Sequence, residues 1–215
     1  MDKKVFVVGG DIHYASFLNF KYQLVDNPKE ADIVIFTGGA DVHPMIYGCK
    51  EVARCGTYLE RDIREKEIFE SLTNKQLVIG ICRGSQLMCA LNGGILVQDC
   101  DNHGIFGTHE IETVEGEKYQ ITSTHHQMQC PYKIKKSYYD IYAWANRCTY
   151  YLGDNMSISI VKKLKEKEPE IVIYHKPLTP RCIAIQGHPE MMRKNCDTVK
   201  MLNNLINKEL NKIKK

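Results

Sequence analysis

Short runs of apolar residues alternate with amphipathic stretches through the first half of the chain. Residues 5–8, 33–36 and 77–81 are continuous apolar runs rich in β-branched side chains, typical of strands buried on both faces of a parallel sheet. Residues 61–72 place apolar side chains at helical spacing, and residues 85–91 form another helical run that should end at Asn92-Gly93-Gly94. This alternation predicts an α/β fold with an open, mostly parallel sheet flanked by helices.

The pattern changes in the middle third of the chain. Residues 110–115, 119–122, 141–144 and 157–161 alternate or are rich in β-forming side chains, with no helix between them long enough to join parallel strands. We therefore expect an additional small antiparallel sheet. Residues 170–174 and 182–186 should pair as a hairpin, and an apolar stripe predicts a final helix over residues 199–213.

Composition narrows the class of protein without changing this picture. The chain has 215 residues, 43% hydrophobic and 26% charged, so we expect residues 1–215 to form a single globular domain. The net charge of +3 is too small to indicate a nucleic-acid partner. No apolar run approaches the roughly 18 residues that a membrane span needs. The nine cysteines include no C-x-x-C pair and no signal sequence precedes them, which favours a reducing cytoplasm.

The segment Gly80-Ile-Cys-Arg-Gly84 lies between the third apolar run and the following helix. A nucleophile between small residues at a strand-to-helix turn is typical of a nucleophile elbow, a tight turn that holds the side chain out at the edge of the sheet. Amide dipoles at the helix start favour the thiolate, which is the reactive form of cysteine. The pattern predicts that Cys82 attacks a carbonyl group.

A cysteine nucleophile needs a base, and the base needs an acidic partner that orients it. The segment Gln186-Gly-His-Pro-Glu190 follows a predicted strand and supplies both. His188 and Glu190 are two residues apart, so on an extended backbone their side chains point the same way and can form a hydrogen bond. We predict His188 as the base and Glu190 as its orienting carboxylate.

Thr37-Gly-Gly-Ala-Asp-Val-His-Pro44 follows the second predicted strand and should reach the same edge of the sheet. A tetrahedral intermediate needs two amide donors for its oxyanion. We assign these to the Gly38-Gly39 loop, at Gly39, and to the amide of Arg83 directly after the nucleophile.

Together these segments resemble the class I (triad-type) glutamine amidotransferases and the gamma-glutamyl hydrolases, most of all the gamma-glutamyl-gamma-aminobutyrate hydrolase branch. The match includes G-I-C-R-G-S-Q at 80–86, the glycine loop at 38–48 and Q-G-H-P-E at 186–190, and it spans about residues 32–192. Arg61-Asp62 with Glu65, residues 93–99 and Ser-Thr-His-His-Gln at 123–127 add to it. The resemblance implies a flavodoxin-like sheet. Two features depart from the pattern. The region before the glycine loop is shorter than in those hydrolases, and Gly187 lies where they commonly carry an aromatic residue.

The resemblance also implies the roles of the site residues. Cys82, His188 and Glu190 are the catalytic triad, and substrate is held by Gly38, Gln86, Ser123, Thr124 and His125. The activity implied is cysteine-dependent hydrolysis of the glutamine side-chain amide, without a cofactor, with ammonia delivered to a separate ATP-dependent synthetase. The alternatives are a free-standing hydrolase of gamma-glutamyl amines or peptides and a catalytically silent binding subunit on the same fold.

Plainer interpretations of single residues remain. Any one of nine cysteines is more often a buried, small apolar residue than a nucleophile. The prediction that Cys82 is a nucleophile therefore depends on the glycine loop and the His-Pro-Glu motif that accompany it. His125 and His126 with His43, Cys49 and Cys55 suggest a zinc site, but their spacing matches no structural finger, and we expect no metal. Asp41 and Arg83 are either an ion pair near the cleft or two surface charges, and the sequence does not decide between these.

Overall fold

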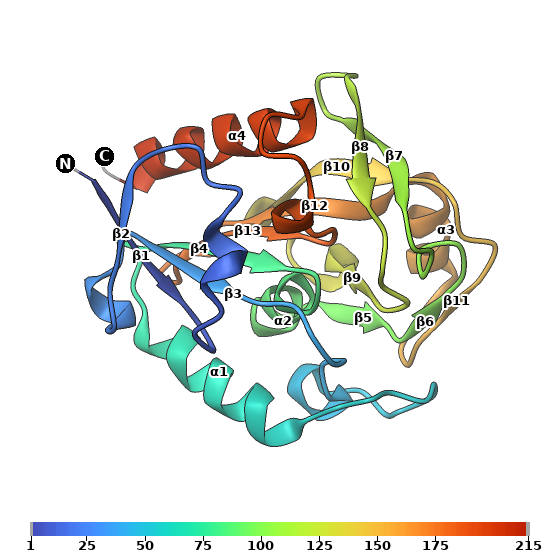
Figure 1. The fold of residues 1–215 in the computed structure, drawn as a ribbon. Coiled ribbons are helices and arrows are strands. Elements are labelled where there is room, and N and C mark those ends of the chain that lie inside the picture. The colour runs from blue at the N-terminus through green and yellow to red at the C-terminus, as the bar shows by residue number, and fades with distance from the viewer. Residues whose placement is uncertain (1, 214–215) are drawn as a thin grey trace.

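A single large sheet runs through the molecule (Figure 1). The computed structural model describes residues 2–213, and within them nine strands join in the order β2-β1-β3-β4-β13-β12-β10-β7-β8. The strands from β2 to β13 in this order pair in parallel, as expected for the apolar runs that form β1, β3 and β4. Their bounds are β1 Lys3–Val7, β2 Tyr22–Leu24, β3 Ile33–Phe36, β4 Leu77–Ile81 and β13 Arg181–Ile185.

The remaining strands of the large sheet pair antiparallel. They are β7 Thr108–Thr113, β8 Lys118–Thr122, β10 Tyr139–Ala145 and β12 Glu168–Tyr174. The expected pairing of residues 170–174 with 182–186 is confirmed as the β12–β13 hairpin. Small antiparallel sheets are also present, formed by β5 Ile95–Val97 with β9 Met128–Cys130 and by β6 Asp99–Cys100 with β11 Tyr151–Leu152. Most of the predicted antiparallel strands thus extend the large sheet.

Helices cover both faces of the sheet. Side chains at alternate strand positions point to opposite faces, so Phe36 and Val78 pack under α2 Arg83–Leu91 and α1 Leu59–Ser71. Ile35 and Ile79 pack on the other face with α4 Asp197–Ile213. Figure 1 shows α4 above the sheet and α1 and α2 below it. The layered α/β fold predicted from the sequence is therefore confirmed.

The expectation of a strand at residues 157–161 is wrong. This segment begins α3, Ile158–Glu166, in which Ile160 and Leu164 are buried four residues apart. Ser157 caps the helix, since its side chain accepts a hydrogen bond from the amide of Ile160. The alternating Ser-Ile-Ser-Ile pattern also satisfies a helix with one buried side, and the cap decides between the two.

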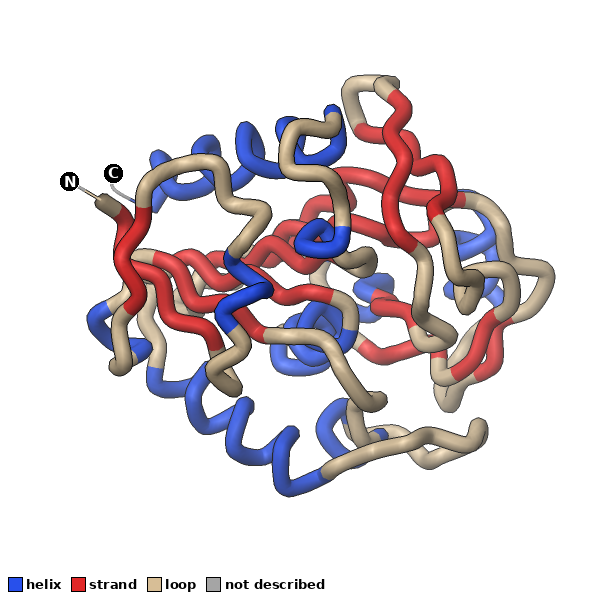
Figure 2. Tube along the Cα trace, in the orientation of Figure 1, coloured by secondary structure: helices blue, strands red, loops and turns tan. Residues whose placement is uncertain are grey.

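The parallel strands bring distant loops to one edge. Because β3, β4 and β13 run in the same direction, the segments that follow Phe36, Ile81 and Ile185 leave the sheet together. Figure 2 shows these loops gathered at one end of the strands. In the described part of the chain, no helix is both long and apolar enough to span a membrane.

Candidate active site

Cys82 lies in a strained turn between β4 and α2. Its backbone has φ 52° and ψ −109°, a conformation that residues with a side chain rarely adopt. The amide of Cys82 donates to the carbonyl of Ile185, 2.8 Å away, which fixes the turn to β13. Gly84 passes so close to β3 that a Cβ atom there would lie 2.3 Å from the carbonyl oxygen of Phe36. Gly84 is thus required by close packing of the elbow.

His188 and Glu190 lie beside this turn. Nδ1 of His188 is 2.7 Å from Oε1 of Glu190, and both side chains are buried. The amide of His188 donates to Oγ1 of Thr122 at 2.6 Å, so β8 helps to fix His188. Burial alone would lower the pKa of His188, but hydrogen bonds with Cys82 and Glu190 and their negative charges outweigh it and raise the pKa to about 10. The arrangement therefore favours a protonated, cationic imidazole at His188.

The Gly38-Gly39 loop is held by Arg61 of α1. Nη2 of Arg61 donates to the carbonyl oxygen of Gly38 and to Oγ1 of Thr37, each at 3.0 Å. In a trans peptide the N–H points opposite to the C=O, so this contact turns the amide of Gly39 away from Arg61. Gly39 has φ 135°, and a Cβ atom there would lie 2.5 Å from Nη1 of Arg61. The position therefore requires glycine.

Arg83 contributes differently through its backbone and its side chain. Its amide is in the first turn of α2, where N–H groups have no partner within the helix. Its guanidinium is buried and donates to Glu65 Oε2 at 2.5 Å and to Asp62, both on α1. The guanidinium therefore forms neither of the contacts considered from the sequence, since it pairs with α1 rather than with Asp41 or solvent.

A cavity of about 270 Å³ lies in front of Cys82. Gly39, Gln86, Thr124 and His125 line it among the predicted site residues. Gln86 donates through Nε2 to the carbonyl of Gln127 at 3.0 Å, while its Oε1 has no hydrogen-bond partner within residues 2–213. Burial, the largest influence, lowers the pKa of His125 to about 3, so its imidazole is neutral.

Ser123 and Gly38 lie outside this lining. The amide of Ser123 donates to the carbonyl of Gly107, and its hydroxyl donates to the carbonyl of His103 at 2.5 Å. The amide and the hydroxyl of Ser123 are therefore engaged away from the cavity. Gly38 packs against Cys82 and His188 instead, because a Cβ atom there would lie 2.9 Å from Cε1 of His188 and 3.5 Å from Cβ of Cys82.

An ionic group that the sequence did not indicate lies at the cavity wall. His126 is 3.2 Å from both Asp41 Oδ2 and Asp99 Oδ1. Its hydrogen bond with Asp41 contributes most to a pKa of about 9, against burial, which would lower it. Because His126 and Asp41 both line the cavity, this side of it combines a cationic imidazole with a carboxylate.

Sequence reasoning also missed Tyr14. This residue is in a short 3₁₀ helix, Ile12–Ala15, that follows β1, and its hydroxyl lies close to Gly38. Its pKa is raised by burial and by the nearby groups of Glu190 and Cys82, so the phenol stays neutral. The signal available was Gly9-Gly10 after the first strand, which leads to the same sheet edge as the other site loops.

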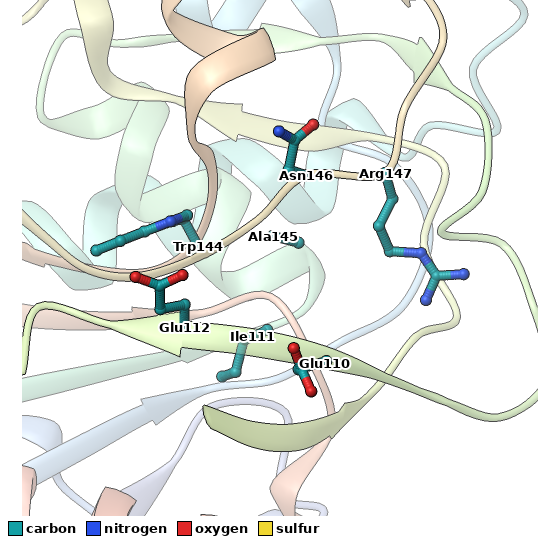
Figure 3. Close-up of a pocket in the computed structure, with 7 residues that line it drawn as sticks. All are labelled: Glu110, Ile111, Glu112, Trp144, Ala145, Asn146 and Arg147. Carbon is teal, nitrogen blue, oxygen red and sulfur yellow. The ribbon is translucent and has the colours of Figure 1, made fainter. Parts of the chain in front are cut away.

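A larger hollow lies elsewhere on the molecule. It has a volume of about 360 Å³ and lies between β7 and the end of β10, with Trp144 and Glu112 at one side and Arg147 at the other (Figure 3). None of the predicted site residues lines it. Its lining contains no cysteine or histidine, and none of it belongs to the cavity at Cys82.

The sequence of this chain matches a known protein family. The model of the family described as Peptidase C26 matches residues 23–137, more than half of the 215 residues, and these include the glycine loop and Cys82. This chain belongs to the Peptidase C26 family. The resemblance to the class I glutamine amidotransferase superfamily, noted from the sequence motifs, is thereby confirmed.

Curated relatives of this C26 member carry related names. A Lactococcus lactis protein named "Putative glutamine amidotransferase-like protein YvdE" is 26% identical over 172 residues, covering 74% of this chain and 66% of that protein. Protein NtpR of Enterococcus hirae is 29% identical over 133 residues, covering 48% of this chain and 56% of NtpR. The chain spans about half to two thirds of the length of the curated relatives that it matches.

Solved structures share the fold of this C26 chain. A Thermoplasma acidophilum protein, described as part of a putative GMP synthase, superposes with a TM-score of 0.60 at 16% identity, covering 99% of this chain and 94% of that one. A Thermotoga maritima glutamine amidotransferase gives a TM-score of 0.50 at 16% identity, covering 100% and 86%. At this identity the likeness establishes the fold: a flavodoxin-like class I amidotransferase sheet.

Proposed function

We propose that this protein hydrolyses the side-chain amide of L-glutamine through a γ-glutamyl thioester on Cys82. One observation supports this most strongly: a cysteine in a strained turn at a helix start, beside a buried His188–Glu190 pair. A thiol held in that way is a nucleophile with its own base and orienting carboxylate. Membership of Peptidase C26 agrees with amide hydrolysis.

The reaction proceeds in two halves. The Cys82 thiolate attacks the amide carbon, forming a C–S bond and a tetrahedral oxyanion. His188, protonated in the resting pair, gives its Nε2 proton to the leaving nitrogen as the C–N bond breaks and ammonia departs. Water then enters and gives a proton to His188 as its oxygen attacks the thioester. Collapse of the second intermediate releases glutamate and restores the thiolate–imidazolium pair.

The oxyanion is held by two backbone amides in this proposal. The amide of Arg83 has no partner within α2, and Arg61 turns the amide of Gly39 away from itself. Amide donors fixed before the reaction stabilise the charge that develops on the oxygen, and loss of one such donor typically slows catalysis by about 10²–10³-fold. The buried ion pairs of Arg83 with α1 keep the first turn of α2 in place.

The substrate lies in the cavity in front of Cys82. The unpartnered Oε1 of Gln86 is an acceptor for the α-amino group of the substrate, and Asp41 offers it a negative charge. His126, held as a cation between Asp41 and Asp99 with both ring nitrogens engaged, keeps Asp41 in place. Thr124 and His125 complete the wall. These groups favour a γ-glutamyl compound with a free α-amino group.

The ammonia passes to a separate ATP-dependent synthetase in this proposal. The fold of the chain resembles that of a protein described as PurLQS from Thermotoga maritima, with a TM-score of 0.54, as well as that of the putative GMP synthase component. Such a partner would dock over the mouth of the cavity, where the substrate loops lie. Ammonia release from glutamine should therefore be slow alone and rise when the cognate synthetase is added.

A second candidate is a free-standing hydrolase of γ-glutamyl amines or peptides, which the peptidase description of the family favours. A panel of γ-glutamyl amines, γ-glutamyl peptides and glutamine, tested on the purified protein with and without candidate synthetases, separates the two. Fast turnover of a γ-glutamyl amine by the protein alone would reject the amidotransferase proposal. Stimulation of glutamine hydrolysis by a synthetase supports it.

A third candidate, a silent binding protein on the same fold, is opposed by the intact triad. The Cys82→Ser variant tests it, because serine keeps the shape of the side chain but is a far weaker nucleophile without a stronger base. Loss of ammonia release in this variant rejects the silent binding protein. Equal release by both proteins would reject the assignment of Cys82.

A further inference from the structure

A buried cluster of histidines and glutamates lies at the loop between β8 and β9, which carries Thr124 and His125. His103 is in the loop before β7, His109 is on β7, His125 is in the loop after β8, and Glu168 and Glu170 are on β12. All five side chains are essentially inaccessible to solvent. The proposed hydrolysis uses none of their ring nitrogens or carboxylates, so the cluster needs its own explanation.

Three imidazole nitrogens converge on one carboxylate oxygen. Oε1 of Glu170 lies 2.9 Å from Nε2 of His109, 3.3 Å from Nδ1 of His103 and 3.9 Å from Nε2 of His125. Ligands at the usual zinc distance of about 2.0–2.1 Å in a tetrahedron are roughly 3.3 Å from one another. His103, His109 and Glu170 thus form a group with metal-ligand spacing, and the ring of His125 lies beside it, with Nε2 3.9 Å from the same carboxylate oxygen.

The cluster leaves polar atoms unsatisfied. Within residues 2–213, no hydrogen-bond partner exists for Nδ1 of His103, Nδ1 of His109, Nε2 of His125 or Oε2 of Glu170. His103 Nδ1 is near Glu170 but without hydrogen-bonding geometry. Each such buried group costs about 1–3 kcal/mol when unpaired. A cation bound at the converging nitrogens would engage two of these atoms, Nδ1 of His103 and Nε2 of His125.

The outer contacts hold the rings in the form that binds a metal. Nε2 of His103 faces Glu168 Oε2 at 3.0 Å, and Nδ1 of His125 faces the carbonyl of Gln127 at 2.9 Å. If those nitrogens carry the protons, the inward nitrogens present lone pairs, which is the usual carboxylate–histidine–metal or carbonyl–histidine–metal arrangement. Glu168 is itself fixed by the amides of Arg147 and Cys148 and the hydroxyl of Tyr151.

Charge balance points the same way. In the part of the chain that the structure describes, Glu168 and Glu170 make ion-pair contacts only with these histidines and have no Lys or Arg partner. Two buried carboxylates need compensating positive charge. A divalent cation supplies it in one step and lets all three imidazoles stay neutral.

We propose that His103, His109, His125 and Glu170 bind a divalent transition-metal ion of the zinc class in a structural site. The three nitrogens and one oxygen suit such an ion, and no open position for water remains in the four-coordinate arrangement. The ion would tie β7 and β12 to the loop that carries Thr124 and His125 to the cavity. His43, Cys49 and Cys55 belong to neither of the groups with metal-ligand spacing among the described residues.

Metal content tests the site directly. The Cys82→Ser protein, in which zinc cannot bind the thiol of Cys82, is stripped with chelator, titrated with Zn²⁺ and dialysed before mass-spectrometric metal analysis. We expect about one equivalent per chain and a higher melting temperature with zinc. His109→Gln in the same background should bind at least about 10-fold more weakly. The matched control His175→Gln, which alters a histidine paired with Asp140 outside the cluster, should bind as the parent does.

Cobalt substitution supplies a readout that does not depend on a variant folding. The Co²⁺ form of the parent should show the strong visible bands of a tetrahedral ion without a thiolate-to-cobalt charge-transfer band. Failure to retain zinc or cobalt, equal binding by folded His109→Gln, or a thiolate band would each overturn the proposal. A thiolate band would place the metal at Cys148, which with His103 and Glu168 forms the other group of suitable spacing.

Discussion

His188 and Glu190 form a buried hydrogen bond, with Nδ1 2.7 Å from Oε1, across a single intervening proline. The carboxylate holds the proton on Nδ1 and leaves Nε2 for the thiol of Cys82. Glu190→Gln keeps the shape but removes the charge and the tautomer preference. We expect kcat for glutamine hydrolysis to fall about 10³–10⁴-fold with little change in KM. Steady-state ammonia release measures both constants.

Glu110→Gln is the matched control for this variant. Glu110 is exposed and pairs with Lys118 on the neighbouring strand, away from the cavity. Its loss should leave kcat unchanged, because exposed ion pairs contribute little. A Glu190→Gln protein as active as Glu110→Gln would show that another group orients His188.

Arg61→Ala tests the oxyanion assignment of Gly39. Without the guanidinium, the carbonyl of Gly38 loses its partner, and the Gly38–Gly39 peptide is free to turn. We expect kcat to fall about 10²-fold, as for loss of one oxyanion donor, while KM changes much less. Arg64→Ala, at an exposed position one turn along the same helix, serves as the control. Equal kcat in the two variants would contradict the role of Arg61.

Gly84→Ala tests the packing of the elbow. The added Cβ would meet the backbone of β3, which cannot move without disturbing the sheet. We expect a loss of about 3 kcal/mol in the free energy of unfolding, measured by urea denaturation. Gly107→Ala, where a Cβ meets nothing within 4 Å, should change it far less. Similar stabilities would mean that the elbow tolerates a side chain and is wider than described.

The pair of His126 with Asp41 predicts a pH dependence. The folded-state pKa of His126 is raised to about 9. The stability that the pair contributes to the folded protein is therefore fully present below the ordinary histidine pKa of 6.5, and it is lost as pH rises through 9. NMR titration of the His126 ring should show a midpoint near 9, and Asp41→Asn should lower it, since Asp41 is the largest cause. KM for glutamine should rise over the same range. A midpoint near 6.5 in the unaltered protein would contradict this pairing.

Much of the fold follows from local pattern. The apolar runs of β3 and β4 specify buried parallel strands at their observed bounds, and Asn92-Gly93 ends α2 as expected. The start of α3 was misassigned because a short alternating segment satisfies either period, and only the Ser157 cap and the later Leu164 decide. That residues 1–215 act as one domain stays a prediction.

The site was predictable where residues with reactive side chains or flexible backbone lie in short motifs directly after predicted strands. Cys82, His188 and Gly39 meet because their strands run parallel, which the apolar runs already indicate. The partners of Arg83 were not predictable, because Asp62 and Glu65 belong to a helix whose orientation depends on packing. Tyr14 likewise reaches Gly38 only through a short 3₁₀ turn that carries no motif.

The thioester on Cys82 is the central claim, and trapping it is the most direct test. The protein is mixed with glutamine, quenched in acid within the first turnovers, digested, and examined by mass spectrometry with Cys82→Ser as the control. The account predicts one γ-glutamyl group on the peptide that contains Cys82, and neither adduct nor ammonia release from Cys82→Ser. An adduct on another residue, or ammonia release at the normal rate from Cys82→Ser, would contradict it.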